Sequence, residues 1–128
     1  MHTIRHQVYA TLQGKSLNQE VFEQLPEVSG VGRYLNADDP GIRYPERAQF
    51  HLPEVSHTPS AVSDYISGLE KYYATLQRGG VRHIILRWTI LSNDHRHQIN
   101  TEVSAEDLAR LASMNASLAI TFSAAAKR

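Results

Sequence analysis

Cysteine is absent from this chain of 128 residues, and aromatic residues make up only 8% of it. Without cysteine there is no disulfide framework, no thiolate metal site and no cysteine nucleophile. The 13 lysine and arginine residues balance the 13 aspartate and glutamate residues, so the formal net charge is zero with histidine neutral. A neutral chain lacks the overall positive charge that attracts nucleic acid, although a local basic patch would still do so.

Long apolar runs and catalytic motifs are also missing. No run approaches the ~18 apolar residues of a transmembrane helix, and the first ten residues, MHTIRHQVYA, lack the apolar segment of a secretory signal. Neither GxSxG nor HExxH occurs, and Gly30-Val31-Gly32 is a GxG without a third glycine. We therefore expect a cytoplasmic protein without membrane contact, folded as a single domain over residues 1–128.

The most consistent structural signals lie between residues 81 and 122. Residues 81–91 are rich in β-branched and aromatic side chains, which predicts a strand. One side of that strand is predicted to face the core because its alternate positions form an unbroken apolar row. The row consists of Ile84, Leu86, Trp88 and Ile90. Turn residues at 92–94 and the alternation at 96–103 predict an antiparallel return strand.

A short helix and a last strand are predicted after this hairpin. Ser104 is the expected N-cap, since its hydroxyl can accept a hydrogen bond from a first-turn amide. Glu106 and Asp107 follow at the positive end of the helix dipole, and Asn115 is the expected stop. Residues 118–122 then alternate between apolar and small or polar side chains, which predicts a strand.

The first half of the chain shows similar patterns. Residues 3–12 alternate as a strand, and the side carrying His6 and Leu12 is predicted to face inward. Ser16, with Gln19 three residues later, matches a capping box, so we expect a helix from Ser16 to Pro26. Short strands are expected at 33–35 and, at an edge of the sheet, at 48–52. The longest helix should begin at Thr58 or Ser60 and end at Gly79-Gly80.

A strand followed by a capped helix thus occurs twice, at residues 8–25 and 99–112. Two βαβ-type halves of this kind predict a ferredoxin-like α+β fold. We expect an antiparallel sheet of four to five strands with helices mainly on one face. An open sheet edge in such a fold would also allow a homodimer.

A candidate partner-binding surface lies in the polar segment between residues 33 and 47. Tyrosine and arginine anchor many protein–protein contacts, because they offer a large rigid area or several donors at little entropic cost. A long loop with these residues suits recognition, whereas pairing of arginine with aspartate in water is the simpler alternative. The predicted contact residues are Arg33, Tyr34, Asp38, Asp39, Arg43, Tyr44 and Arg47.

A metal site is the basis of an enzymatic alternative. His95 and His97 would point to one side of a strand beside Asp94, and two imidazoles with a carboxylate can hold zinc. With Asp94 or Asp38 they would suit a metal-assisted hydrolase. A solvated polar turn explains the same residues more simply, as a turn does for Asp38 and Asp39 before Pro40. We therefore predict no metal, no cofactor and no catalytic residue.

RNA binding is a second alternative, based on the predicted polar face of the sheet. Similar sheets bind RNA by stacking bases on several aromatic residues. Here Tyr9 alone would be available, because Trp88 is expected to point inward, so a nucleic-acid partner ranks below a protein partner. The residues expected on that face are Arg5, Gln7, Tyr9, His83, Arg87, Arg96, Gln98 and Asn100.

The last strand–helix–strand segment, with SAEDLARL as its helix and SLAITF as its final strand, resembles small stand-alone bacterial domains of unknown function. The resemblance covers residues 81–122 and, less closely, 8–25, and it implies a ferredoxin-like core but no functional residue. Small domains of this general kind include immunity proteins, which bind and neutralise a cognate toxin. Our preferred hypothesis is a non-enzymatic protein-binding domain, such as an immunity-type inhibitor of a bacterial toxin.

Overall fold

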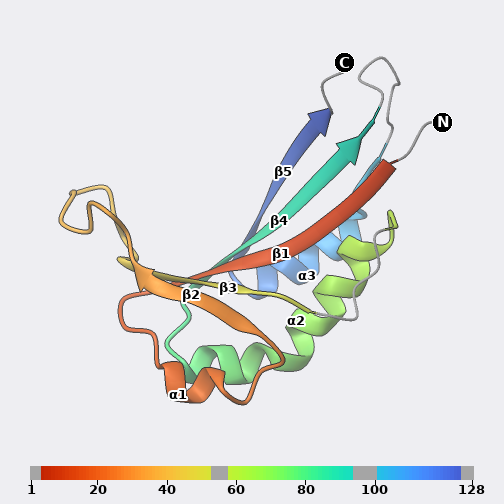
Figure 1. Cartoon of the computed structure of the whole chain (residues 1–128). Helices are drawn as coiled ribbons and strands as arrows, with labels where there is room; N and C mark the ends of the chain where they lie inside the picture. Colours follow the sequence, from red (N-terminus) through yellow and green to blue (C-terminus); the bar gives the residue numbers. More distant parts are fainter. Residues whose placement is uncertain (1–3, 53–57, 94–100, 125–128) are drawn as a thin grey trace.

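The computed structural model describes residues 4–52, 58–93 and 101–124. Within these segments the fold is α+β, with a five-stranded mixed sheet and three helices (Figure 1). The elements in chain order are β1 (Ile4–Gly14), α1 (Gln19–Phe22), β2 (Val28–Arg33), β3 (Glu46–Phe50), α2 (Ala61–Arg78), β4 (His83–Ser92), α3 (Ala105–Ser113) and β5 (Ala116–Ala124).

The sheet has the strand order β2-β3-β1-β4-β5. β1 lies at its centre and is antiparallel to both β3 and β4, and β2 is antiparallel to β3. β5 is parallel to β4, because a strand–helix–strand connection through α3 returns the chain in its original direction. The sheet is therefore mostly antiparallel, and the expectation of an antiparallel sheet is wrong at β5.

Three of the expected strands differ from those observed. Residues 101–103, the end of the predicted return strand, have no strand conformation, and residues 94–100 lie outside the described residues. β2 begins at Val28 instead of residue 33. β3 lies between β2 and β1 and is not an edge strand.

The core lies between the sheet and the helices, which all cover the same face of the sheet (Figure 1). Trp88 is 1% exposed and belongs to this core with the other members of its predicted apolar row, so that prediction is confirmed. Phe50 of β3 and Tyr65 of α2 pack edge to face, and the Tyr65 hydroxyl donates a hydrogen bond to the Phe50 carbonyl. Burial raises the pKa of Tyr65, which therefore stays a donor.

α1 is much shorter than the predicted helix and begins later. Asn18, not Ser16, is its N-cap, and the Asn18 side chain accepts a hydrogen bond of 3.0 Å from the Glu20 amide. The Ser16 carbonyl instead lies against Gly80, where a Cβ atom would collide with it. Gly80 has φ +92°, a conformation that glycine adopts without strain, and it joins the end of α2 to β4.

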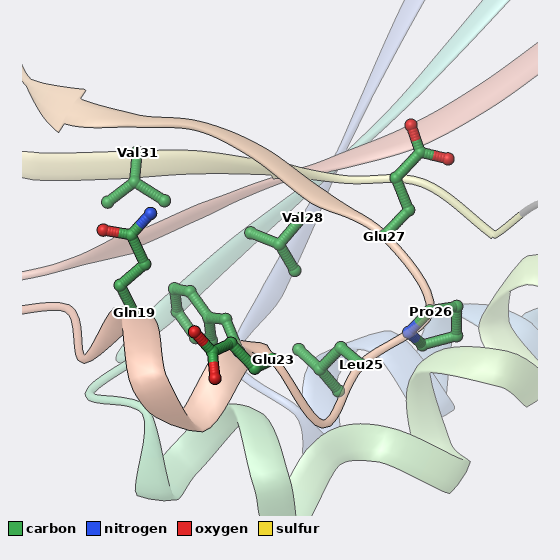
Figure 2. Close-up of a pocket in the computed structure, with 8 residues that line it drawn as sticks. Gln19, Glu23, Leu25, Pro26, Glu27, Val28 and Val31 are labelled. Atoms are coloured by element: carbon green, nitrogen blue, oxygen red, sulfur yellow. The ribbon is translucent and has the colours of Figure 1, made fainter.

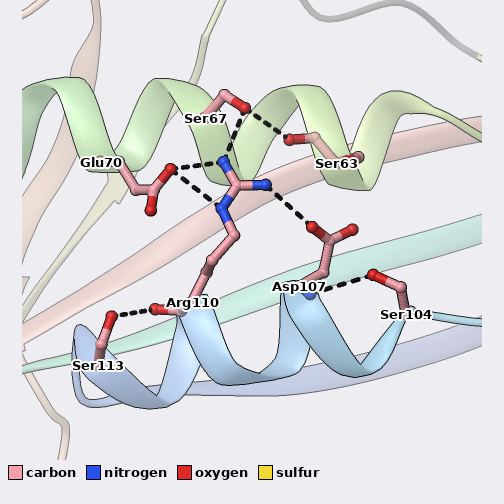
Figure 3. Close-up of polar contacts among 7 residues, drawn as sticks. All are labelled: Ser63, Ser67, Glu70, Ser104, Asp107, Arg110 and Ser113. Atoms are coloured by element: carbon pink, nitrogen blue, oxygen red, sulfur yellow. Dashed lines mark hydrogen bonds and ion pairs between the residues drawn. The ribbon is translucent and has the colours of Figure 1, made fainter.

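α3 is anchored to α2 by a polar cluster around Arg110 (Figure 3). The Arg110 guanidinium lies 2.5 Å from Glu70 of α2 and 2.9 Å from Asp107 of its own helix, and it donates to Ser67 at 2.8 Å. The hydrogen bond from Arg110 lowers the pKa of Glu70. At the start of α3 the Ser104 hydroxyl accepts from the Asp107 amide, which confirms the predicted N-cap. The cluster thereby holds α3 against α2.

Candidate functional site

The face of the sheet opposite the helices carries a basic surface, which we call the open face. Residues that pair across a sheet ladder share a face, and the pairs Tyr9 with Arg87 and Gln13 with Arg47 show which rows point away from the helices. These positions are Arg5, Gln7, Tyr9, Thr11 and Gln13 of β1, Arg47 and Gln49 of β3, His83, Ile85, Arg87, Thr89 and Leu91 of β4, and Ser117, Ala119, Thr121 and Ser123 of β5.

No aspartate or glutamate occupies any of these strand positions, whereas three arginines do. Arg5 and Arg47 are exposed, and Arg87 is half-buried with its Nε donating to the Thr11 hydroxyl at 2.7 Å. Glu46 of β3 points to the other side of the sheet, where its carboxylate accepts from the Leu17 amide at 2.6 Å. The described part of this neutral chain thus presents a locally positive surface.

Tyr34 lies at the start of the long β2–β3 loop and is tied to the sheet. Its amide donates to the Pro45 carbonyl at 2.9 Å across the base of the loop, and its hydroxyl accepts a hydrogen bond from the Gln13 side chain. The Arg47 guanidinium lies 5.0 Å from the centre of the Tyr34 ring, within the range of a cation–π interaction. These contacts hold the half-buried Tyr34 ring at the border of the open face.

Tyr44 lies at the other end of the same loop. Its ring stacks on His83 of β4 at 6.0 Å with an interplanar angle of 11°, and the Arg43 guanidinium lies 5.9 Å from the ring centre. His83 Nε2 in turn lies 3.3 Å from the Ser117 hydroxyl of β5. The loop therefore folds its second tyrosine against residues of the open face.

A third tyrosine lies further along β1. Tyr9 stacks on His51 at 5.2 Å with an interplanar angle of 15°, and it is paired in register with Arg87. The open face consequently combines arginine, histidine and three ordered tyrosine rings. Such a surface can bind negatively charged groups through the arginines and flat or apolar groups through the rings.

The seven predicted contact residues divide into three groups. Tyr34 and Tyr44 border the open face and Arg47 belongs to it, and we call these three residues the tyrosine rim. Asp38 and Asp39 belong to the β2–β3 loop, which projects beyond the sheet (Figure 1). They lie within consecutive turns closed by hydrogen bonds from the Asp39 amide to the Asn36 carbonyl and from the Ile42 amide to the Asp39 carbonyl. The remaining two, Arg33 and Arg43, are exposed, and Arg33 lies 3.8 Å from Glu46.

Gln13 and His83, which hold the two rim tyrosines, were not among the predicted contact residues. The alternation of polar and apolar residues in the sequence placed His83 on the polar face. The contacts of Gln13 and His83 with the loop, however, depend on the order and register of the strands. Leu35 was also missed; it is 95% exposed near the base of the loop. No local sequence pattern reveals these contacts.

The histidine-based metal site falls on Asp94, His95 and His97, which lie outside the described residues. In the segments that the structure describes, no group of three or more histidine, aspartate or glutamate side chains is placed to hold a metal ion. Asp38, the other proposed ligand, lies in the projecting loop.

A hollow of about 360 Å³ lies on the helix side of the sheet between α1 and β2 (Figure 2). Its apolar lining comes from α1, from β2 and from the segment between them, and the Glu27 carboxylate points away from it. The residues that line it are Gln19, Phe22, Glu23, Leu25, Pro26, Glu27, Val28 and Val31.

Comparisons with protein-family models, with curated proteins and with solved structures found no match for this chain. Among the described helices, none combines the length and apolar character that crossing a membrane requires.

Proposed function

We propose that this protein is a non-enzymatic cytoplasmic binding domain, and that its open face and tyrosine rim receive an acidic surface of a protein partner. The observation that carries the proposal is the position of Tyr34 and Tyr44 beside a sheet face that bears three arginines and no carboxylate among its strand positions. Positive charge there would attract an acidic partner and orient it on the face.

The side chains of the tyrosine rim are held in place by neighbouring residues, and this supports the proposal. Tyr34 is held by Gln13 and Arg47, and Tyr44 by stacking on His83. Side chains that are already fixed lose little conformational entropy when a partner binds, so more of the contact energy appears as affinity. Tyrosine and arginine are also the residue types that dominate binding energy in many interfaces.

We also propose that β1 to β4 form a ferredoxin-like core to which α3 and β5 are added. The support is the element order β1-α1-β2-β3-α2-β4 together with the strand order β2-β3-β1-β4, in which all neighbours are antiparallel. In this proposal the second βαβ-type half is β3-α2-β4 and not residues 99–112. The resemblance of residues 81–122 to small bacterial domains supports an immunity-type inhibitor as the form of this binding protein.

Charge reversal tests the proposed surface. We expect Arg5→Glu with Arg47→Glu to reduce recovery of the native partner in a quantitative pull-down by about tenfold or more, since about 1.4 kcal/mol of lost binding energy corresponds to a factor of ten. The matched control is Lys71→Glu with Arg78→Glu, which makes the same change in net charge on exposed positions of α2. Equal losses in both variants, or an unchanged recovery with the open-face variant, would contradict the proposal.

The same pull-down distinguishes the contribution of the loop tyrosines to binding from that of the sheet arginines. We expect Tyr34→Ala with Tyr44→Ala to abolish recovery as well. Both rings are half-buried, so the melting temperature of this variant must be measured alongside and compared with that of wild type. Retained recovery in a folded Tyr34→Ala/Tyr44→Ala variant would remove the rim from the contact surface.

Single-stranded RNA is a second candidate for the open face. It is favoured by one observation, the three tyrosine rings distributed among arginines, because RNA-binding sheets stack bases on aromatic residues and neutralise phosphates with basic ones. Nuclease treatment of the captured material distinguishes an RNA partner from a protein partner. RNase-sensitive recovery that falls with rising salt would assign the surface to RNA instead of an acidic protein.

A further inference from the structure

The β5 edge of the sheet has no covering strand in the described structure. β5 is the last strand in the sheet order and pairs with β4 alone, in a continuous register from Ala116 opposite Ile84 to Ala124 opposite Ser92. Over its nine residues it contains no charged residue, no proline and no glycine. A long regular edge of this kind presents unpaired backbone groups that can accept another strand.

The opposite edge, β2, is built differently. It has six residues, its register with β3 shifts between Ser29 and Gly32, and Gly30 has φ +65°. Bulges, short length and charged residues are the devices by which proteins prevent edge pairing. β2 has such features, including Arg33 at its end, whereas β5 has none of them.

The apolar row of β5 is uncovered as well. Leu118, Ile120 and Phe122 are paired with Leu86, Trp88 and Ile90 of β4, so they point to the helix side of the sheet. Ile120 is 54% exposed and Phe122 50% exposed, although their β4 partners are 1% and 3% exposed. Leu108 of the neighbouring helix α3 is also 48% exposed.

We propose that this edge binds a second copy of the same chain, with the two β5 strands antiparallel about a two-fold axis at Ile120. In this register Ile120 faces its own copy, and Leu118 faces Phe122 of the second copy. On the other side of the strand Ser117 would face Ser123, and Ala119 would face Thr121. Every pair is uncharged and similar in character, so the strand is complementary to itself. An acidic partner, in contrast, would find no positive charge along this strand.

The oligomeric state of the purified full-length chain tests this proposal. We expect light scattering to give the mass of a dimer for wild type and half that mass for Ile120→Lys, because the two lysines would meet at the two-fold axis. The control is Ser29→Lys, which adds the same charge to an exposed position on the β2 edge and should remain a dimer. Circular dichroism establishes that each variant is folded.

A mixing experiment tests the register itself. Ile120→Lys mixed with Ile120→Glu should restore the dimer as a heterodimer, because opposite charges then face each other at the axis. If Ile120→Lys does not fold, Ala119→Lys combined with Thr121→Lys makes the same test on the open side of the strand, because position 119 of each copy would face position 121 of the other and like charges would meet. A monomeric wild type would assign the edge to a different occupant and overturn the proposal. A dimer that persists in folded Ile120→Lys, or in the folded Ala119→Lys/Thr121→Lys variant, would also overturn the proposal. Failure of the mixed variants to form a heterodimer would reject the two-fold register.

Discussion

At the scale of single residues, the pairing of His6 with Trp88 is a hydrogen bond between two buried side chains. Trp88 Nε1 donates to His6 Nδ1 at 3.1 Å, and the two rings lie 5.8 Å apart. His6 is 4% exposed, and its burial lowers the pKa of the imidazole. The neutral imidazole accepts this hydrogen bond at Nδ1, whereas protonation at Nδ1 would remove the acceptor.

This contact predicts a pH dependence of stability. Because the folded pKa of His6 lies below its unfolded value of about 6.5, unfolding takes up a proton at acidic pH. The free energy of unfolding should therefore fall as the pH falls from about 6.5 towards the lower folded pKa. We expect His6→Gln to be less stable by about 1–3 kcal/mol at pH 8, as for other disturbed buried hydrogen bonds, and to lose this part of the pH dependence.

Denaturant unfolding of wild type and variant across this pH range measures both effects. His51→Gln is the matched control, since it removes a half-buried histidine from the open face, and it should retain the pH dependence that arises from His6. An equally steep decline in His6→Gln would show that another group is responsible.

The faces of these residues were predictable, but their contact was not. Alternation within residues 3–12 and 81–91 placed His6 and Trp88 on inward-facing sides, and both are buried. Their hydrogen bond depends on the β1–β4 register, which places Val8 opposite Trp88 and His6 opposite Ile90. Register arises from the competition of whole strands for partners, so a local pattern does not determine it.

At the scale of elements, the junction of α2 with β4 depends on close backbone approach. Gly80 has positive φ, and a Cβ atom there would meet the Ser16 carbonyl; one at Gly14 would meet the Gly80 carbonyl. Two segments distant in sequence, residues 14–16 and residue 80, therefore meet where side chains would not fit. The amide of Arg82 then donates to the Gln13 carbonyl at 2.8 Å and continues the β1–β4 ladder.

We expect Gly80→Ala to lower the free energy of unfolding by at least about 1–3 kcal/mol, the cost of a strained backbone conformation for a residue other than glycine. Equilibrium denaturation measures the change. Gly41→Ala, in the projecting loop, is the control because a Cβ atom there meets no atom within 4 Å, and its stability should stay close to that of wild type. A stable Gly80→Ala variant would mean that the junction can rearrange.

Helix boundaries could be predicted where the capping residue is local, and strand partners could not. Ser104 caps α3 as predicted, because a cap needs only residues within one turn. Ser16 matched the same pattern, but its carbonyl lies against Gly80 and the helix begins at Gln19. Residues 96–103 alternated as a strand, yet the strand that pairs with β4 on that side is β5, joined to it in parallel through α3.

At the scale of the whole molecule, the net charge is zero but the charged residues are unevenly distributed. The strand positions of the open face carry three arginines and no carboxylate, so the remainder of the chain carries an excess of negative charge. The sequence showed the zero balance and the polar face, but the absence of acidic residues from this surface follows only from the strand order. A locally charged surface acts on its surroundings even when the total charge is zero.

This distribution predicts that the protein at pH 7 is retained on a cation-exchange resin at low salt. Arg5→Glu with Arg47→Glu should elute earlier than Lys71→Glu with Arg78→Glu, although the two variants have equal net charge. The salt concentration at elution is the measurement. Identical elution of the two variants would indicate that net charge alone governs retention.

The open face has one more consequence when two copies join through β5. Strands that pair edge to edge about a perpendicular axis keep corresponding faces on the same side, so the two open faces would form one extended platform. A target with repeated acidic segments would then bind both open faces at once, and its apparent affinity would rise through avidity without any new kind of contact. The spacing of those repeats, more than the strength of any one of them, would decide which targets the molecule retains.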